Sequence, residues 1–408
     1  MNASPLYTKI ILRIIFIICA LLISLIGAEA IARWRLPQYN QRFLHFQDAG
    51  AWKHFTWSPS LGWKGRAHFC GHFARPEFFH EICQNSAGFR DEDHSLEKKE
   101  GKFRVLVLGD SFVYGFGVNQ GEVFSEVMKR EDSSLEVINA GMSGYSTDIE
   151  YLYLRDEGVL YKPDLVLVAF YLNDVWENNL KTFEDGKWQK PFFEWDDHTL
   201  TLTNLPIPND LEKFIASSSN EERKVVKDMR PSLFFLLSHS VLANVIVDRL
   251  QDIPAAAHIL QKAGVLYPFS LSSLEMYLDP LQAEAVRVQW ERTAAIFGLM
   301  KELTDSKQIP LEVLYIPLRE QFDPEYKKLA SSKGYEVNLP QKTLALLLRQ
   351  YNVPFTDLSS AFIANRENAS SLYYRQDPHL NTAGHTALAH AVEEIVKKYK
   401  DIHYGSNK

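Results

Sequence analysis

The feature that most constrains the fold is an alternation of short apolar runs with helical segments after residue 100. Phe103–Leu108 (FRVLVL), Leu135–Asn139 (LEVIN) and Asp164–Phe170 (DLVLVAF) each have the length and composition of a buried strand. Helices are predicted between them, over Glu122–Arg130 and Asp148–Glu157. Strands that alternate with helices form right-handed βαβ units, so we predict an α/β domain built on a parallel sheet.

The alternation is interrupted after Asn173, and the next convincing strand is Leu311–Ile316 (LEVLYI). This separation is far longer than a crossover needs, so we predict an insertion over roughly residues 176–280. The insertion contains polar loops and an apolar helix around Leu233–Leu250, whose polar side chains favour a packed cap over a membrane contact. The regular pattern resumes with helices over Ala283–Thr304, Gln341–Tyr351 and Thr382–Lys398 and a strand over Val353–Asp357.

The N-terminal segment from Ile10 to Ala28 is apolar apart from Arg13 and approaches the roughly 20 residues that span a bilayer. Basic residues precede its uninterrupted part, as in a signal sequence. We favour a retained membrane anchor; a signal peptide cleaved at Ala28-Glu29-Ala30 and a buried helix are the alternatives. Because a long domain after such a helix is usually translocated, we expect the rest of the chain in the periplasm or outside the cell.

We divide the chain into an anchor (residues 1–32), a lead-in (33–100) and a main domain (101–402) that carries the insertion. The lead-in is rich in aromatic residues without clear periodicity, and we expect it to be irregular and packed on the main domain. The formal net charge of −7 argues against a nucleic-acid-binding protein, which needs a basic surface. The hydrophobic content of 46% excludes a disordered chain.

The chain has three cysteines, and two of them fall in one stretch of the lead-in, HFCGHFARPEFFHEIC. A disulfide between Cys70 and Cys83 suits an oxidising compartment and is the interpretation we favour. Free thiols remain an alternative. A zinc site is the third, because His68, His72 and His80 lie nearby, although the spacing matches no familiar ligand pattern. Cys19 lies in the apolar segment and is interpreted as a small hydrophobic residue.

Unusual polar residues follow the predicted strands. In a parallel sheet, ligands bind outside the carboxyl ends of the strands, so these residues are candidates for a site. The four segments are Gly109-Asp110-Ser111 after the first strand, Gly141-Met142-Ser143-Gly144 after the second, Asn173-Asp174 after the third, and Asp377-Pro378-His379 before the last helix. Each is weak evidence alone, but their order along the chain is specific.

This series resembles that of the SGNH, or GDSL, hydrolases: a Gly-Asp-Ser block, a glycine, an Asn-Asp pair, and a C-terminal aspartate and histidine. The resemblance runs from about Phe103 to the end of the chain, without the insertion. The N-terminal anchor adds a likeness to bacterial membrane-tethered members. The implied fold is three-layered and flavodoxin-like, with a parallel sheet of strand order 2-1-3-4-5.

The resemblance implies a role for each matching residue. Ser111 corresponds to the nucleophile, His379 to the general base and Asp377 to the third triad member, while Ser111, Gly144 and Asn173 supply the oxyanion hole. Many members place the aspartate three residues before the histidine, which here is Gln376. The two-residue spacing of Asp377 instead resembles SGNH-like proteins that O-acetylate exopolysaccharides. His385 is the fallback base, although its place in the last helix favours a packing role.

We therefore predict a serine esterase that cleaves a carboxylic ester, such as an O-acetyl group on a glycan, through an acyl-serine intermediate. An O-acyltransferase acting on an envelope or secreted polysaccharide is the first alternative, because it would use the same acyl-enzyme. A non-catalytic envelope scaffold is the second; the complete set of five residues argues against it. No cofactor or metal is implied, and the predicted partners are the ester substrate and the membrane.

Two further groups of residues have two interpretations each. Arg90, in NSAGFRDED, either approaches an anionic substrate or forms a salt bridge, and we favour the salt bridge. Trp176, Trp188 and Trp195 fall in the insertion and either stack on sugar rings or pack in a core. Because tryptophan is more often a core residue, we favour packing.

Overall fold

The structure is a computed structural model. It describes residues 5–36, 53–75, 77–183, 186, 188–196, 199–211, 213, 215, 235–237, 239–250, 253–263, 274–365, 369–375 and 377–405. The chain divides into two compact units, which are described separately. Unit 1 comprises Met1–Ala49, Ala74–Phe79 and Glu221–Pro268, and unit 2 comprises Gly50–Phe73, His80–Asn220 and Phe269–Lys408.

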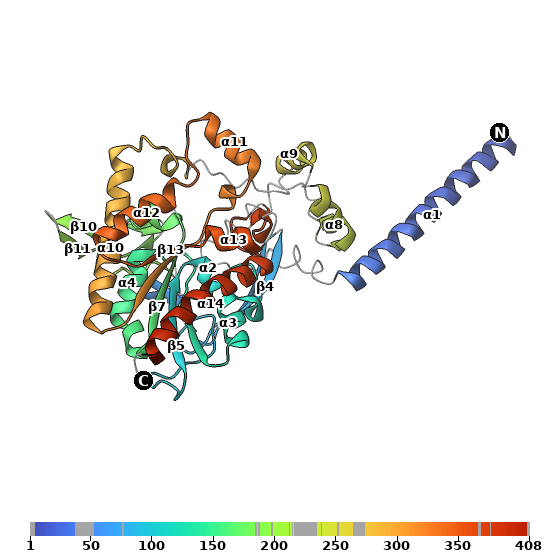
Figure 1. The fold of residues 1–408 in the computed structure, drawn as a ribbon. Coiled ribbons are helices and arrows are strands. Elements are labelled where there is room, and N and C mark those ends of the chain that lie inside the picture. Colours follow the sequence, from blue (N-terminus) through green and yellow to red (C-terminus); the bar gives the residue numbers. More distant parts are fainter. Residues whose placement is uncertain are drawn as a thin grey trace. The chain divides into compact units, whose positions relative to one another are not determined.

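Unit 2 is built on a five-stranded parallel sheet, visible in Figure 1. Its strands are β5 (Phe103–Gly109), β6 (Leu135–Asn139), β7 (Leu165–Phe170), β12 (Leu311–Tyr315) and β13 (Phe355–Asp357). They lie in the order β6-β5-β7-β12-β13. Numbered along the chain, this order is 2-1-3-4-5, so the predicted fold class and strand order are confirmed.

Helices cover both faces of this sheet and complete three layers. The main ones are α3 (Phe124–Glu131), α4 (Thr147–Asp156), α10 (Glu284–Ser306), α12 (Leu339–Gln350) and α14 (Thr382–Gly405). Right-handed crossovers from β5 to β6 and back across to β7 place α3 and α4 on opposite faces. Accordingly, α3 packs against α14, while α4 packs against α10 and α10 against α12. The shorter α11 (Pro324–Ser332) and α13 (Ser359–Asn365) lie in the loops that follow β12 and β13.

The sheet brings three strand ends together. Every residue of β5, β6, β7 and β12 is buried, as expected for parallel strands covered on both faces. Gly109 at the end of β5 pairs with Ala169 of β7, and Val107 of β5 pairs with Asn139 at the end of β6. The segments that follow these strands therefore start from neighbouring points on the carboxyl edge of the sheet.

Contrary to our prediction, the lead-in is not irregular. It contains two strand pairs. β1 (Phe55–Ser58) pairs antiparallel with β2 (Gly62–Gly65), and β3 (Cys70–Arg75) pairs with β4 (Phe78–Cys83). Cys70 and Cys83 are joined by a disulfide, so the thiolates required by the zinc alternative are not available. The aromatic residues that hid the strand pattern pack together: Phe55 and Trp63 are fully buried, with ring centroids 6.4 Å apart.

The insertion contains strands as well as helices. In unit 2, β8 (Thr182–Phe183) pairs with β9 (Trp188–Gln189), and β10 (Phe192–Asp196) pairs with β11 (Thr199–Thr203). In unit 1, the structure describes α8 (Val241–Leu250) and α9 (Pro254–Lys262). Our prediction of polar loops and an apolar helix for the insertion is therefore incomplete, because the first part of the insertion folds as short antiparallel strand pairs.

The apolar helix predicted around Leu233–Leu250 is wrong as a single element. Leu233 lies outside the described residues, and a break at Ser240 precedes α8. The Ser240 hydroxyl accepts a hydrogen bond from the Ala243 N–H at 3.0 Å, and Glu29 accepts from the N–H groups of Val241 and Leu242 at 2.9 and 3.0 Å. Serine and carboxylate oxygens satisfy the free N–H groups of a helix start, so they begin a new helix here.

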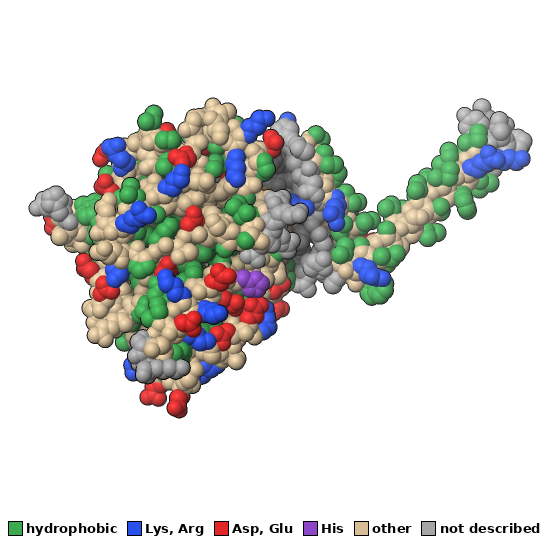
Figure 2. All heavy atoms as spheres, in the orientation of Figure 1, with side chains coloured by type: hydrophobic (Ala, Val, Ile, Leu, Met, Phe, Trp, Pro, Cys, Tyr) green, Lys and Arg blue, Asp and Glu red, His purple; other side chains and the backbone are tan. Residues whose placement is uncertain are grey.

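Helix α1 (Pro5–Arg35) supplies Glu29 and carries the N-terminal apolar segment. Figure 2 shows apolar side chains along this helix, and those from Ile10 to Ile26 are exposed. At 31 residues, it is about 46 Å long, more than the thickness of a bilayer core. It is therefore long and apolar enough to cross a membrane, a property that it shares with signal sequences.

Candidate active site

Ser111 is the first residue of the short helix α2 (Ser111–Tyr114), which begins directly after β5. Asp110 caps this helix: its Oδ1 accepts a hydrogen bond from the Phe112 N–H at 2.8 Å. A side chain at Gly109 would place its Cβ 2.3 Å from Val113 Cγ2, so only glycine allows the turn to close this tightly. The Gly-Asp-Ser block thus forms a compact strand-to-helix turn that presents the Ser111 hydroxyl at the carboxyl edge of the sheet.

The Ser111 hydroxyl is hydrogen-bonded to a histidine from the other end of the chain. His379 Nε2 lies 2.7 Å from Ser111 Oγ, and His379 Nδ1 lies 2.5 Å from Asp377 Oδ1. The same carboxylate oxygen accepts the backbone N–H of His379 at 3.0 Å, which is a local turn within the loop before α14. The structure therefore brings together Ser111, His379 and Asp377 in a continuous chain of hydrogen bonds.

Contacts on both sides hold the histidine loop. The Tyr374 hydroxyl donates to the Gly117 carbonyl at 2.7 Å and so ties this loop to the segment that follows α2. The imidazole of His379 also lies against Phe112 and Phe116, at ring-centroid distances of 4.9 and 4.7 Å. The aspartate two residues before the histidine makes the contact, and Gln376, three residues before it, lies outside the described residues.

Gly144 and Asn173 follow the two strands that flank β5. Gly144 has φ +79°, a conformation that favours glycine, and a Cβ there would lie 2.4 Å from Cζ of Phe183. Asn173 begins α5 (Asn173–Glu177), and its Nδ2 donates to Glu177 Oε2 at 3.2 Å. The backbone of both segments is thus constrained: the conformation at Gly144 requires glycine, and a helix begins at Asn173.

A cluster of buried and partly buried carboxyl groups lies behind Asn173. Its members are Asp110, Asp148 and Glu150 of α4, Asp174 and Glu177, together with Lys190. Lys190 Nζ pairs with Asp148 Oδ2 at 2.8 Å and donates to the Ser146 hydroxyl and the Glu177 carbonyl. Lys190 therefore pairs directly with one of the five carboxyl groups, Asp148, an arrangement that we did not predict from the sequence.

Four members of this acidic cluster, Asp110, Glu150, Asp174 and Glu177, have raised pKa values, first of all because burial disfavours the charged form. Burial and repulsion from the neighbouring carboxylates raise the pKa of Glu150 and that of Asp174 well above their usual values. Burial likewise raises the pKa of Asp110; the hydrogen bond from the Phe112 N–H, the charge of His379 and the hydrogen bond from the Asn173 side chain act in the opposite direction. Burial raises the pKa of Glu177 to about 8. Strongly perturbed groups beside a candidate nucleophile are typical of functional sites.

Arg90 forms no salt bridge with any residue that the structure describes, so the interpretation that we favoured is wrong. Its guanidinium group is buried and donates to the backbone carbonyls of Gly115 and Val118 at 2.5 Å and to that of Glu81 at 2.7 Å. It thereby fastens the segment after α2 to β4. Arg90 is a structural support for the turn that carries Ser111.

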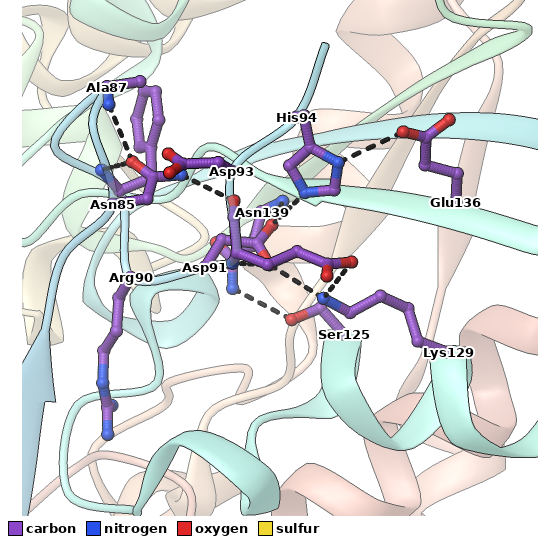
Figure 3. A network of polar contacts seen from close by, with 12 residues as sticks. Asn85, Ala87, Arg90, Asp91, Asp93, His94, Ser125, Lys129, Glu136 and Asn139 are labelled. Carbon is purple, nitrogen blue, oxygen red and sulfur yellow. Dashed lines mark hydrogen bonds and ion pairs between the residues drawn. The ribbon is translucent and has the colours of Figure 1, made fainter. Parts of the chain in front are cut away.

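Next to Arg90, the lead-in contacts the β6 edge of the sheet through a network of paired charges, shown in Figure 3. Asp91 accepts from Lys129 Nζ at 2.8 Å and from the Asn139 N–H at 2.7 Å, and His94 lies between Asp91 and Glu136. Arg104, which is fully buried, binds both oxygens of Glu136, through Nε at 2.9 Å and Nη2 at 3.1 Å. We call Asp91, His94, Arg104, Lys129 and Glu136 the paired network.

The remaining candidates from the sequence have packing roles. His385 is buried and stacks on Phe124 at a centroid distance of 6.3 Å, and burial lowers its pKa to about 3. Trp188 is buried against Trp63 and Phe183, and Trp176 stacks on Tyr277. Trp195 is 36% exposed on β10. Of the three tryptophans, Trp195 presents the most surface to solvent.

A serine, a histidine and an aspartate are hydrogen-bonded in series at the carboxyl edge of the parallel sheet. This α/β fold and this site define the protein as a serine hydrolase. The sequence matches the model of the GDSL-like lipase/acylhydrolase family over residues 107–387. The chain belongs to this family, and the resemblance noted in the sequence is confirmed.

Solved structures of the family are similar to this chain at low identity. A GDSL-like lipase from Bacteroides thetaiotaomicron is 12% identical, with 75% of this chain and 92% of that chain covered and a TM-score of 0.33. An acetyl xylan esterase is 13% identical, with 72% and 99% covered and a TM-score of 0.37. A lipase/acylhydrolase from Enterococcus faecalis is 13% identical, with 72% and 96% covered and a TM-score of 0.34. No curated protein matches the sequence.

Proposed function

We propose that the protein is a membrane-anchored serine esterase that hydrolyses a carboxylic ester on the outer side of the cytoplasmic membrane. The observation that carries this proposal is the hydrogen-bonded series from Ser111 Oγ to His379 Nε2 and from His379 Nδ1 to Asp377. A serine hydroxyl is a weak nucleophile, and a neighbouring base that is oriented by a third group activates it.

In the proposed reaction, Ser111 Oγ attacks the ester carbonyl while its proton passes to His379 Nε2. Asp377 holds the imidazole in the required tautomer and stabilises the imidazolium that forms. The imidazolium then protonates the departing alcohol, which leaves an acyl group on Ser111. A water molecule, activated by His379 in the same way, releases the acid and restores the free serine.

The tetrahedral intermediate carries a negative charge on the former carbonyl oxygen. The proposed donors to this oxyanion are the backbone N–H groups of Ser111 and Gly144 and the side-chain amide of Asn173. The strand pairing supports this role, because all three residues follow adjacent strands at one edge of the sheet. One such donor typically contributes a factor of about 10²–10³ in rate.

Acyl transfer to a polysaccharide is the second candidate function. Asp377 stands two residues before His379, the spacing that resembles SGNH-like proteins that O-acetylate exopolysaccharides. A sugar hydroxyl would then replace water as the acceptor, and the acyl-serine would be unchanged. Incubation with an acetyl ester and an added polysaccharide separates the two: acetate release supports the esterase, and acetylated polysaccharide supports the transferase.

A fluorophosphonate probe tests for the activated serine. We expect the detergent-solubilised full-length protein to be labelled, and Ser111→Ala and His379→Ala to remain unlabelled. Ser143→Ala, which changes a nearby serine outside the proposed triad, is the matched control and should be labelled like the wild type. A folded wild-type protein that does not react would contradict the proposal.

The membrane location of the proposed esterase is tested separately. Because α1 is long and apolar enough to cross a membrane, we expect the full chain to remain in the membrane fraction after a carbonate wash. Its N-terminal sequence should then begin before Ala28. A mature protein that begins after Ala30 and is released as a soluble species would instead identify a cleaved signal peptide.

A further inference from the structure

The side-chain amide of Asn173 interacts with two carboxyl groups, that of Glu177 one helical turn later in α5 and that of Asp110 after β5. Its Nδ2 donates to Glu177 Oε2 at 3.2 Å, and the second N–H of the same amide is not used by this bond. Among the residues that the structure describes, the buried Asn173 Oδ1 has no hydrogen-bond partner. Among the described residues, Glu177 and Asp110 therefore orient this carboxamide.

The orientation of a carboxamide is chemically decisive in an oxyanion hole. Rotation about the terminal torsion of asparagine is broad and roughly two-fold, so either the nitrogen or the oxygen can face a given direction. The nitrogen stabilises an oxyanion, whereas the oxygen repels it. A carboxyl oxygen at Glu177 accepts a hydrogen bond from the nitrogen and so selects one of the two orientations.

We propose that Glu177 is a positioning residue for the oxyanion hole: its bond to Asn173 Nδ2 fixes the carboxamide so that the nitrogen, and not the oxygen, faces the oxyanion. This inference rests on the proposed function. Glu177 is itself held at the end of α5, because Lys190 Nζ donates to its backbone carbonyl at 2.9 Å. Lys190 in turn pairs with Asp148, so the support extends to α4.

The charge state of Glu177 gives the inference a second, independent readout. Glu177 is surrounded by Asp110 after β5, Asp148 and Glu150 of α4, Asp174 of α5 and Lys190 after β9, while Arg292 of α10 acts on Asp148. Burial is the largest effect and raises the pKa of Glu177 to about 8; Asp110 and Asp148 add to it, and Lys190 and the bond from Asn173 oppose it. Below that pH, the carboxyl group accepts the hydrogen bond without adding a negative charge beside the oxyanion.

Ionisation above about pH 8 places a negative charge one hydrogen bond away from the amide that stabilises the developing oxyanion. Like charges repel strongly where water is excluded, so the transition state becomes less stable. We therefore expect the kcat of the wild type to fall as the pH rises through about 8. Glu177→Gln keeps an oxygen that accepts from Asn173 but cannot ionise, and its kcat should not fall in that range.

The experiment measures kcat and KM for p-nitrophenyl acetate with the detergent-solubilised full chain. We expect Glu177→Ala to lower kcat by about tenfold, part of the factor of about 100 that one oxyanion donor supplies, with KM changed less than about twofold. Glu177→Gln should restore kcat at pH 7 to within about twofold of the wild type. Glu157→Ala, at an exposed glutamate of the same unit, is the matched control and should be unaffected.

A double-mutant cycle shows whether Glu177 acts through Asn173. If it does, Glu177→Ala has no further effect in the Asn173→Ala background, since the amide that it positions is gone. A tenfold loss in both backgrounds, or no loss in the wild-type background, would overturn the inference while leaving the esterase proposal intact. If Glu177→Ala fails to fold, an alkaline loss of kcat that persists in Glu177→Gln overturns it. A wild type without esterase turnover contradicts the proposed function itself, and the inference falls with it.

Discussion

At the β6 edge of the sheet, Asp91 and Glu136 are buried beside Arg104, Lys129 and His94, whereas behind Asn173 the acidic cluster is buried with Lys190 as its cation. Hydrogen bonds and charges from His94 and Lys129 keep the pKa of Asp91 below its usual value despite burial, and Arg104 and His94 do the same for Glu136. In the acidic cluster, burial and neighbouring carboxylates raise the pKa of Glu150 and that of Asp174. Burial raises the pKa of a carboxyl group in both regions; cations and hydrogen bonds outweigh it for Asp91 and Glu136, whereas neighbouring carboxylates add to it for Glu150 and Asp174.

The paired network uses buried charge for structure, whereas the acidic cluster lies beside the proposed site. Breaking a buried ion pair leaves an uncompensated charge and destabilises the fold. The paired network joins the lead-in to the sheet, so the loss of one of its members should destabilise the protein. Carboxyl groups that are held neutral avoid that cost and keep negative charge away from the proposed oxyanion. We therefore expect substitutions in the paired network to change stability first, and substitutions around Asn173 to change turnover first.

The largest effect on stability is expected for Arg104→Met. This change leaves Glu136 buried without its bidentate partner and removes the donor to the Tyr161 carbonyl. We expect a loss of about 3–5 kcal/mol in the free energy of unfolding, measured by thermal or urea denaturation, with turnover of the folded fraction retained. Arg155→Met breaks a half-exposed pair with Asp156 and is the control, with an expected change within about 1 kcal/mol. A loss no greater than that of the control would contradict a structural role for the paired network.

Asn173→Ala should produce the converse result. Removing the proposed side-chain donor should lower turnover of a short ester by about 10²–10³ and leave the unfolding midpoint near that of the wild type. Asn179→Ala is the matched control, because the Asn179 side chain bonds to the Val175 carbonyl outside the proposed oxyanion hole. Turnover near the wild-type value for Asn173→Ala would remove this residue from the site.

The pH dependence of stability should have opposite signs in the two regions, and this is the smallest of the effects. The pKa of Glu150 is raised in the folded protein, so the folded state binds more protons than the unfolded state above the unfolded pKa, and stability falls as the pH rises toward the folded value. Glu150→Gln removes this dependence and should gain stability relative to the wild type as the pH rises from about 5 to 8.

Asp91→Asn is the matched change in the paired network. The pKa of Asp91 is lowered on folding, so its contribution is present above the unfolded pKa and is lost as the pH falls through the folded one. The destabilisation caused by Asp91→Asn should therefore be full at neutral pH and should shrink in acid. Unfolding midpoints measured over the same pH range test both variants, and equal slopes would contradict the comparison.

Much of the fold followed from residue pattern. The five strands of the sheet were predicted within a few residues, because strands covered on both faces must be apolar and because the helices between them have their own period. The lead-in was not predicted in this way. Its strands are short and their aromatic residues, such as Trp63 and Phe55, pack on one another, so no alternation of apolar and polar residues marks them.

Several side-chain contacts were not predicted because residues far apart in the sequence form them. The break at Ser240 depends on Glu29, which lies far away in the sequence and caps the start of α8. Arg90 binds carbonyl groups because the turn after α2 lies over it; the acidic neighbours Asp91 and Asp93 in the sequence do not pair with it, and Asp91 pairs with Lys129 instead. Such partners are chosen by tertiary contacts, which a local pattern does not contain.

Local periodicity in the sequence predicted the parallel sheet, and short motifs placed Ser111, Gly144, Asn173, Asp377 and His379 in order along the chain. The family and the strand order followed from the resemblance that these motifs carry. Which carboxyl groups are paired and which lie together depends on tertiary contacts. Asp110, Glu150, Asp174 and Glu177 come from three separate segments, and the burial and mutual repulsion that raise their pKa values exist only after the sheet has brought those segments to one edge.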